Sequence, residues 1–188
     1  MRKAIKVRSY NSSIFDCRIR HLQFMSFSRE SFYTDINAKK PEYGSMLTRG
    51  INLQFMPTPQ NVHVFAQQFV DFLKNIRSME LDYSATSLPI VEAVLEGFYT
   101  KHENVDTNAV MIFAIGCYIG EVLAKKCGGK WLNASDANWP VRVNSMLIVI
   151  KLPSGLYIDQ IAKAFRRSYY GNAESIMDYY MELVSANS

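Results

Sequence analysis

The stretch AIGCYIGEVLAKKCGGKW, residues 114–131, decides how this chain folds. It belongs to a helical segment with apolar or small residues on every side, which is typical of a central, buried helix. Gly116 and Gly120 stand four residues apart in this helix, and each costs about 1 kcal/mol relative to alanine. Two such glycines indicate that a second element packs very close to the helix. Two lysines followed by Gly128 predict where the helix ends.

Two amphipathic helices are expected before the central one. The first has Asn61 as its N-cap and runs to Arg77, with phenylalanines along one face. The second has Ser87 as its N-cap and ends near Lys101. Pro89 lies in its first turn, where proline is tolerated because the first amide hydrogens of a helix have no partner within it.

The remaining pattern predicts two strands and two further helices. Residues 51–55 alternate apolar and polar side chains, as in a half-buried strand, and 146–152 form a continuous apolar run typical of a central strand. A helix is expected over 157–169, and a last helix has Asn172 as its N-cap. The residues expected on the inward side of the helix at 157–169 are Ile158, Ile161, Ala162 and Phe165. The predicted class is α+β: about five helices, one central and buried, packed against a small, mostly antiparallel sheet.

Charge divides the chain into a basic N-terminal arm, residues 1–50, and one domain, residues 51–188. The whole chain has a formal net charge of +4, but residues 1–56 carry ten lysines and arginines against four acidic residues. The basic residues are scattered singly, which favours a solvated surface over nucleic-acid binding. The longest uncharged stretch is shorter than the roughly 20 apolar residues of a membrane span. We therefore expect a cytoplasmic protein with no membrane partner.

Motifs for catalysis, metals and nucleotides are missing from the sequence. The three histidines lie in separate segments, without HxxxH spacing, and there is no phosphate-binding loop or GxSxG motif. The three cysteines are an odd number, which suits reduced thiols. Cys127 follows two lysines that would lower its pKa, but without a histidine base nearby it is interpreted as a plain helix-end cysteine. We expect neither a metal nor a cofactor.

Glu121, the first acid after the apolar part of the central helix, has two interpretations. A partly buried carboxylate needs a partner. It could accept hydrogen bonds from the backbone amides of a loop, or pair with Arg166 or Arg167. Alternatively it could be a general base of raised pKa in a pocket. A hydrolase site would need a second acid or a metal at suitable spacing, and the sequence offers neither, so the structural interpretation is favoured.

Two tryptophans flank a polar loop, LNASDANWP. Trp131 is expected to pack on the helix end. Trp139 could be exposed, and exposed tryptophan is common at binding hot spots; the alternative is a tryptophan that covers the edge of the sheet. Asp136 and Asn138 lie in the same loop. The predicted partner-binding residues are therefore Asp136, Asn138 and Trp139.

Three stretches together resemble a known family: LDYSATSLPIVEAVL at 81–95, IGCYIGEVLAKKCGGKW at 115–131, and LPSGLYIDQIAKAFRRSYYGNAESIMDYY at 152–180. This is a family of bacterial domains that share an LDYSxxSL turn, a GxYxGE helix ending in GGxW, and a final IxKxFxR…G…S…Y segment. The resemblance covers residues 51–184 and implies a small cytosolic α+β protein without assigned catalytic residues. The motif residues interpreted as fold determinants are Gly116, Gly120, Glu121, Gly129, Trp131, Arg166 and Gly171.

The resemblance also implies a function. Similar small proteins are often found beside secreted toxins, where they look like immunity proteins. We therefore expect a non-enzymatic binding protein whose partner is a protein, such as a toxin; a homodimer is also compatible with the sequence. The alternatives are an enzyme that uses Glu121 in a pocket and a nucleic-acid accessory protein that uses the basic arm.

Overall fold

The fold is that of a computed structural model, which describes residues 56–102, 108–137 and 148–187. The predicted strand at 51–55 and the basic arm lie outside the described residues. The chain divides into two units, residues 1–40 and 41–188, and every described residue belongs to the second.

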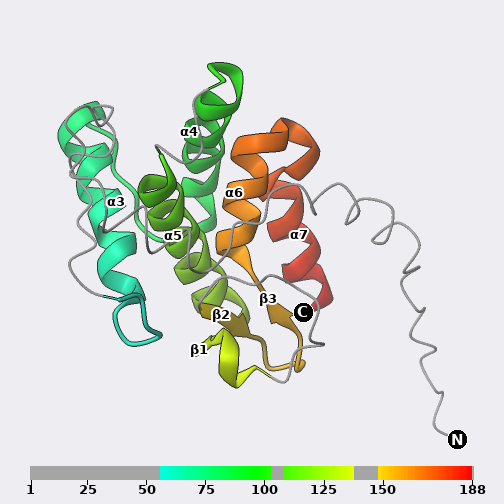
Figure 1. Ribbon diagram of the computed structural model, residues 1–188. Coiled ribbons are helices and arrows are strands. Elements are labelled where there is room, and N and C mark those ends of the chain that lie inside the picture. The colour runs from blue at the N-terminus through cyan, green and yellow to red at the C-terminus, as the bar shows by residue number, and fades with distance from the viewer. Residues whose placement is uncertain (1–55, 103–107, 138–147, 188) are drawn as a thin grey trace, which may run out of the picture. The chain divides into compact units, whose positions relative to one another are not determined.

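Within the described residues, five α-helices and a three-stranded antiparallel sheet form an α+β fold, which confirms the predicted class (Figure 1). The helices are α3 (Val62–Arg77), α4 (Leu88–Thr100), α5 (Ala109–Cys127), α6 (Gln160–Tyr170) and α7 (Ile176–Ala186). The strands are β1 (Lys130–Asn133), β2 (Ile148–Lys151) and β3 (Tyr157–Ile158). Short 3₁₀ helices are η2 (Ala85–Ser87), η3 (Ala134–Asp136) and η4 (Gly171–Glu174). None of the described helices has the length and apolar character needed to cross a membrane.

The central helix is α5, as the sequence predicts. Its buried residues lie on every side of the helix, and α3 and α6 both pack against it (Figure 1). Phe65 of α3 meets Phe113 of α5 edge-on, with ring centroids 5.3 Å apart, a favoured arrangement of aromatic rings. Gly128 follows α5 with a φ of 69°, the left-handed conformation that glycine adopts readily at helix ends. The predicted end of this helix is therefore confirmed.

Helices α3 and α4 begin directly after Asn61 and Ser87, but neither side chain caps its helix. Asn61 Oδ1 accepts a hydrogen bond from the backbone N–H of Thr58 at 2.7 Å. Ser87 Oγ donates to the carbonyl oxygen of Ser84 at 2.6 Å. Both side chains therefore bind the preceding turn instead of the helix that follows.

The sheet has the strand order β1-β2-β3. Trp131 of β1 lies opposite Ile150 of β2, and Ile150 lies opposite Ile158 of β3. The three isoleucine and valine residues of β2 are completely buried. The predicted central strand at 146–152 is thus confirmed over Ile148–Lys151, while residues 146 and 147 lie outside the described part of the chain.

The predicted helix at 157–169 is wrong at its start. Tyr157 and Ile158 form β3, and α6 begins at Gln160. Asp159 caps α6, since its Oδ1 accepts a hydrogen bond from the backbone N–H of Ala162 at 2.9 Å. The chain pairs with β2 before it turns into the helix.

The inward side of α6 also differs from the prediction. Ile161 is buried as expected, but Ala162 and Phe165 are partly exposed. Ala164 and Arg167 are buried instead. They lie three and six residues after Ile161, which keeps them near the same side of the helix, and that side faces α4 and α5.

The last helix is capped by Ser175 and not by the predicted Asn172. Ser175 Oγ accepts a hydrogen bond from the backbone N–H of Asp178 at 3.2 Å. Asn172 is exposed in η4, which inserts a further turn between α6 and α7. Gly171, with a φ of 67°, ends α6 at the predicted position.

Candidate functional site

Gly116 and Gly120 are both points of close contact with other elements. A Cβ atom added at Gly116 would lie 2.6 Å from Cα of Ile161, in the backbone of α6. A Cβ atom added at Gly120 would overlap the indole ring of Trp131. The prediction that an element packs very close to this helix is confirmed, and it is α6 that approaches most closely at Gly116.

Gly129 and Trp131 connect α5 to the sheet. A Cβ atom at Gly129 would lie 2.5 Å from Cγ2 of Ile150, so only glycine fits between α5 and β2 at this point. Trp131 Nε1 donates a hydrogen bond to Glu121 Oε1 at 2.8 Å. The indole ring therefore lies over Gly120 and binds the carboxylate next to it.

The partner of Glu121 differs from both predicted ones. Its carboxylate binds the indole of Trp131, whereas Arg166 and Arg167 pair with other acids. Glu121 is also not among the residues that line the pocket described below. Neither arginine pairs with Glu121, because Arg166 binds Glu174 of η4 and Arg167 binds Glu96 of α4.

Substitution of Glu121 tests whether its hydrogen bond with Trp131 stabilises the fold. Glu121→Gln keeps an oxygen that accepts from Trp131 Nε1 but loses the charge, so we expect the free energy of unfolding to fall by about 1 kcal/mol. Glu121→Ala removes that acceptor and should cost about 1.5–3 kcal/mol, the usual range for a hydrogen bond to a charged group. Urea denaturation followed by tryptophan fluorescence measures both variants. Equal losses for the two variants would show that the acceptor oxygen of residue 121 does not contribute to stability.

Tyr118 links α5 to the LDYS turn. Its hydroxyl lies 2.6 Å from Ser87 Oγ and accepts a hydrogen bond from the backbone N–H of Tyr83 at 3.0 Å. Burial raises the pKa of Tyr83 to about 12 and also raises that of Tyr118. Both hydroxyls therefore stay protonated near neutral pH, and the cluster holds the turn against the central helix.

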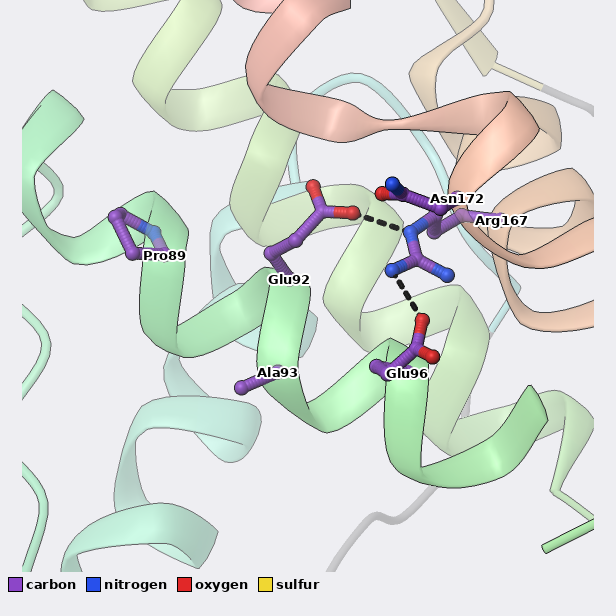
Figure 2. A pocket seen from close by; sticks show the side chains of 6 residues that line it. All are labelled: Pro89, Glu92, Ala93, Glu96, Arg167 and Asn172. Atoms are coloured by element: carbon purple, nitrogen blue, oxygen red, sulfur yellow. Dashed lines mark hydrogen bonds and ion pairs between the residues drawn. The ribbon is translucent and has the colours of Figure 1, made fainter. Parts of the chain in front are cut away.

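Arg167 is the centre of a buried polar cluster that joins α4 and α6. Its side chain is only 2% exposed, and it binds two acids of α4 (Figure 2). Nε donates to Glu92 and Nη2 donates to Glu96, the latter at 2.5 Å. Burial alone would lower the pKa of Arg167, but the hydrogen bonds to these carboxylates and their charges raise it above its usual value. The guanidinium therefore stays charged in the folded protein.

Glu92 also holds the start of α7. Its Oε2 accepts hydrogen bonds from the backbone N–H groups of Ile176 and Met177, at 2.7 and 3.2 Å. A carboxylate suits this place because the first amide groups of a helix are free and the helix dipole is positive there. One carboxylate thus joins α4, α6 and α7.

A shallow pocket of about 400 Å³ lies beside this cluster (Figure 2). The residues that line it are Pro89, Glu92, Ala93, Glu96, Arg167 and Asn172. Both oxygens of Glu92 and two nitrogens of Arg167 already bind other parts of the protein. The charged groups in the pocket wall therefore hold the helices together, and Glu96, whose side chain is 41% exposed, is the more exposed of its two carboxylates.

Arg166 takes part in a second ion-paired cluster. Glu174 Oε2 of η4 lies 2.7 Å from Lys163 Nζ and 3.4 Å from Arg166 Nε. Burial tends to raise the pKa of Glu174, but the hydrogen bond from Lys163 and the two positive charges lower it overall. Arg166 therefore connects α6 to η4 at a position that is 39% exposed.

The predicted partner-binding loop is described only in part. Asp136 is exposed in η3, and its carboxylate accepts hydrogen bonds from Asn133 Nδ2 at 2.7 Å and Ser135 Oγ at 3.2 Å. Asn138 and Trp139 lie outside the described residues. The binding role of this loop stays a prediction.

Cys127 is a free, partly exposed thiol whose pKa lies above its usual value. Lys126 lowers the pKa of Cys127, as the sequence predicts, but burial raises it by more, so the pKa is raised overall. Among the residues that the structure describes, no group of three or more histidine, cysteine or acidic side chains is arranged to hold a metal ion.

Sequence reasoning missed the roles of Glu92 and Glu96. The available signal was their spacing of four residues on α4, which places both carboxylates on one face of the helix. Their partner, Arg167, is distant in sequence and so could not be identified from that spacing. Comparisons with protein-family models, curated proteins and solved structures find no match to this chain, so the family resemblance stays a prediction.

Proposed function

We propose that this domain is a non-enzymatic binding protein of the bacterial cytoplasm, and that it neutralises a secreted toxin by direct contact. The family resemblance of the three motifs supports this role. The polar groups of the described residues support it as well. Glu121, Glu92 and Arg167 all bind other parts of the protein, which suits a rigid scaffold better than acid–base catalysis.

The observation that carries the proposal is a group of exposed tyrosines, Tyr99, Tyr169 and Tyr170, which we call the tyrosine patch. They are 38%, 48% and 41% exposed. The rings of Tyr169 and Tyr170 pack edge-on, with centroids 4.8 Å apart. Tyrosine offers a large contact area at little cost in conformational entropy, and it is enriched in protein-binding hot spots.

Contacts between α4 and α6 hold the tyrosine patch in place. A Cβ atom at Gly171 would lie 2.5 Å from Cε1 of Tyr99, so the end of α4 touches the chain just after Tyr170. Arg167, three residues before Tyr170, joins the same two helices through its ion pairs. Side chains held in place before binding lose less entropy when a partner arrives.

Of the predicted loop residues, the structure describes only Asp136, and it lies away from the tyrosine patch. Tyr99 and Tyr170 stand at the C-terminal ends of α4 and α6, whereas Asp136 follows β1 near the opposite end of the described domain (Figure 1). Asp136 and the tyrosine patch can therefore be changed independently.

The proposal predicts protection from a toxin encoded by the adjacent gene. Co-expression of that gene with the wild-type chain should restore growth, and the two proteins should form a complex measurable by calorimetry. Tyr169→Ala together with Tyr170→Ala should weaken the complex by at least about tenfold, as expected for hot-spot residues. Met181→Ala is the matched control, because Met181 is 61% exposed on α7, outside the patch.

Three other results are informative. If the neighbouring protein neither inhibits growth nor binds the chain, the toxin proposal is wrong. If the complex forms but survives loss of the tyrosines and fails with Trp139→Ala, the predicted loop is the contact surface instead. A wild-type chain that is dimeric in sedimentation and becomes monomeric with the two tyrosine changes would assign the patch to a homodimer.

A further inference from the structure

The pocket beside Arg167 holds more negative than positive charge. Arg167 binds Glu92 and Glu96, so one cation stands between two carboxylates and the three charges sum to −1. Neither glutamate takes part in any other ion pair of the described residues. The other two cations of α6 pair with Glu174 instead. One negative charge of this pocket is therefore left without a cation in the part of the chain that the structure describes.

The excess charge belongs to Glu96. Both oxygens of Glu92 are occupied, Oε1 by Arg167 and Oε2 by the first backbone amides of α7. Glu96 binds Arg167 through Oε2 alone, and its Oε1 accepts no hydrogen bond from any residue that the structure describes. The Glu96 side chain is 41% exposed and lines the pocket. It therefore keeps one carboxylate oxygen for a donor from outside the described fold.

Pro89 and Ala93 form an apolar wall of the pocket on α4 (Figure 2). Both are exposed, and together with Glu96 they follow a spacing of four and three residues, which places all three on one side of the helix. A basic side chain has an aliphatic stem that packs on apolar surface and a charged head that reaches beyond it. A pocket of about 400 Å³ with this wall, and with Glu96 on the next turn, matches such a side chain.

The pocket continues into the tyrosine patch. Tyr99 follows Glu96 by three residues on α4, and Tyr170 follows Arg167 by three residues on α6. Residues at this spacing are neighbours on one side of a helix. Arginine and tyrosine are both enriched at protein interfaces, whereas lysine is depleted there. A partner that covers the tyrosine patch would therefore reach the pocket, and arginine is the basic residue that such a contact favours.

We propose that this pocket receives an arginine side chain of the partner protein that covers the tyrosine patch. The guanidinium of the partner donates to Glu96 Oε1, and the stem of its side chain packs on Pro89 and Ala93. The excess negative charge of the pocket is thereby neutralised on binding. The inference rests on the proposed binding function and adds to it the chemistry of one partner residue, but it does not require that the partner be a toxin.

The test uses the full chain, labelled with ¹⁵N, and N-acetylarginine amide as the probe, followed by NMR. The backbone amide signals of Ala93 and Asn172, which line the pocket, should shift and saturate with a Kd of roughly 1–10 mM, as expected for so small a ligand. N-acetylcitrulline amide has nearly the same shape without the charge. It should bind at least about threefold more weakly, since a partly exposed ion pair adds only a modest factor.

Two substitutions separate charge from shape. Glu96→Gln removes the excess charge but keeps an oxygen for Arg167 Nη2, so it should weaken the arginine probe by at least about threefold and leave the citrulline probe unchanged. Ala93→Phe narrows the pocket at an exposed position without changing its charge and should weaken both probes. Glu182→Gln, the same charge change at an exposed residue of α7, is the control and should leave both affinities unchanged.

The possible results separate clearly. Equal affinity for the two probes, or no saturable shift at the pocket amides, would overturn the proposal. An equal loss in Glu182→Gln would also overturn it, because it would indicate only a diffuse charge effect. Tighter binding of N-acetyllysine amide would replace arginine with lysine as the occupant. None of these results uses the neighbouring protein, so the pocket can fail while the toxin proposal stands, and the reverse.

Discussion

Replacing Arg167 with methionine is expected to lower the free energy of unfolding by about 3–5 kcal/mol. Methionine fills much of the same space but leaves Glu92, whose side chain is only 17% exposed, without its cation. Removing one member of a buried ion pair is costly because the remaining charge is uncompensated. The loss is measured by urea denaturation with circular dichroism.

The preceding residue, Arg166, supplies the matched control. Arg166 lies on the same helix, but its side chain is 39% exposed and its Nε is 3.4 Å from Glu174. Exposed ion pairs contribute at most about 1 kcal/mol, so Arg166→Met should have a small effect. If the two substitutions cost the same, the buried cluster around Arg167 would not be the reason for its effect.

A second substitution tests the mechanism of the loss. Glu92→Gln added to Arg167→Met removes the uncompensated charge while keeping an oxygen that can accept from Ile176 and Met177. The double variant should therefore be more stable than the sum of the two single losses predicts, with a coupling of about 0.5–3 kcal/mol. Strict additivity would mean that Arg167 and Glu92 stabilise the fold independently.

The helices were predictable because their signals are local. The uninterrupted apolar character of α5, its glycines and its glycine stop all lie within one stretch of sequence. The same holds for β2, whose β-branched residues are consecutive. Such patterns indicate which sides of a segment are buried, and they do so without knowledge of the element that packs against it.

The start of α6 was not predictable in the same way. Ile158, Ile161 and Phe165 have helical spacing, so the pattern favoured a helix from residue 157. Instead, Tyr157 pairs with Lys151 after the turn, so residues 157 and 158 form a strand and the helix begins later. Short strands depend on a neighbouring strand more than on their own propensity, and that neighbour is not visible in the local pattern.

The partners of the polar side chains were the least predictable part. Arg166 and Arg167 both look like cations at the end of a helix, yet one is half-exposed and the other is buried. Arg167 and Glu92 are 75 residues apart in sequence. Only the packing of α4 against α6 brings them together, and no spacing rule within one helix predicts such a pair.

Replacing Gly116 with alanine is the second large effect that we expect. The new Cβ would lie 2.6 Å from Cα of Ile161, so the backbone of α6 would have to move away from α5. Overpacking of this kind costs up to about 3 kcal/mol, while alanine recovers about 1 kcal/mol of helix propensity. We expect a net loss of about 2 kcal/mol in the free energy of unfolding, measured by denaturation in urea.

Gly97 is the matched control, because it is a helix-interior glycine of α4 with no atom within 4 Å of an added Cβ. Gly97→Ala gains helix propensity without a clash, so it should stabilise the protein by up to about 1 kcal/mol. The two identical substitutions should therefore change stability in opposite directions. A gain at both positions would mean that α5 and α6 do not pack closely at Gly116, and the central helix would then need another explanation for its glycines.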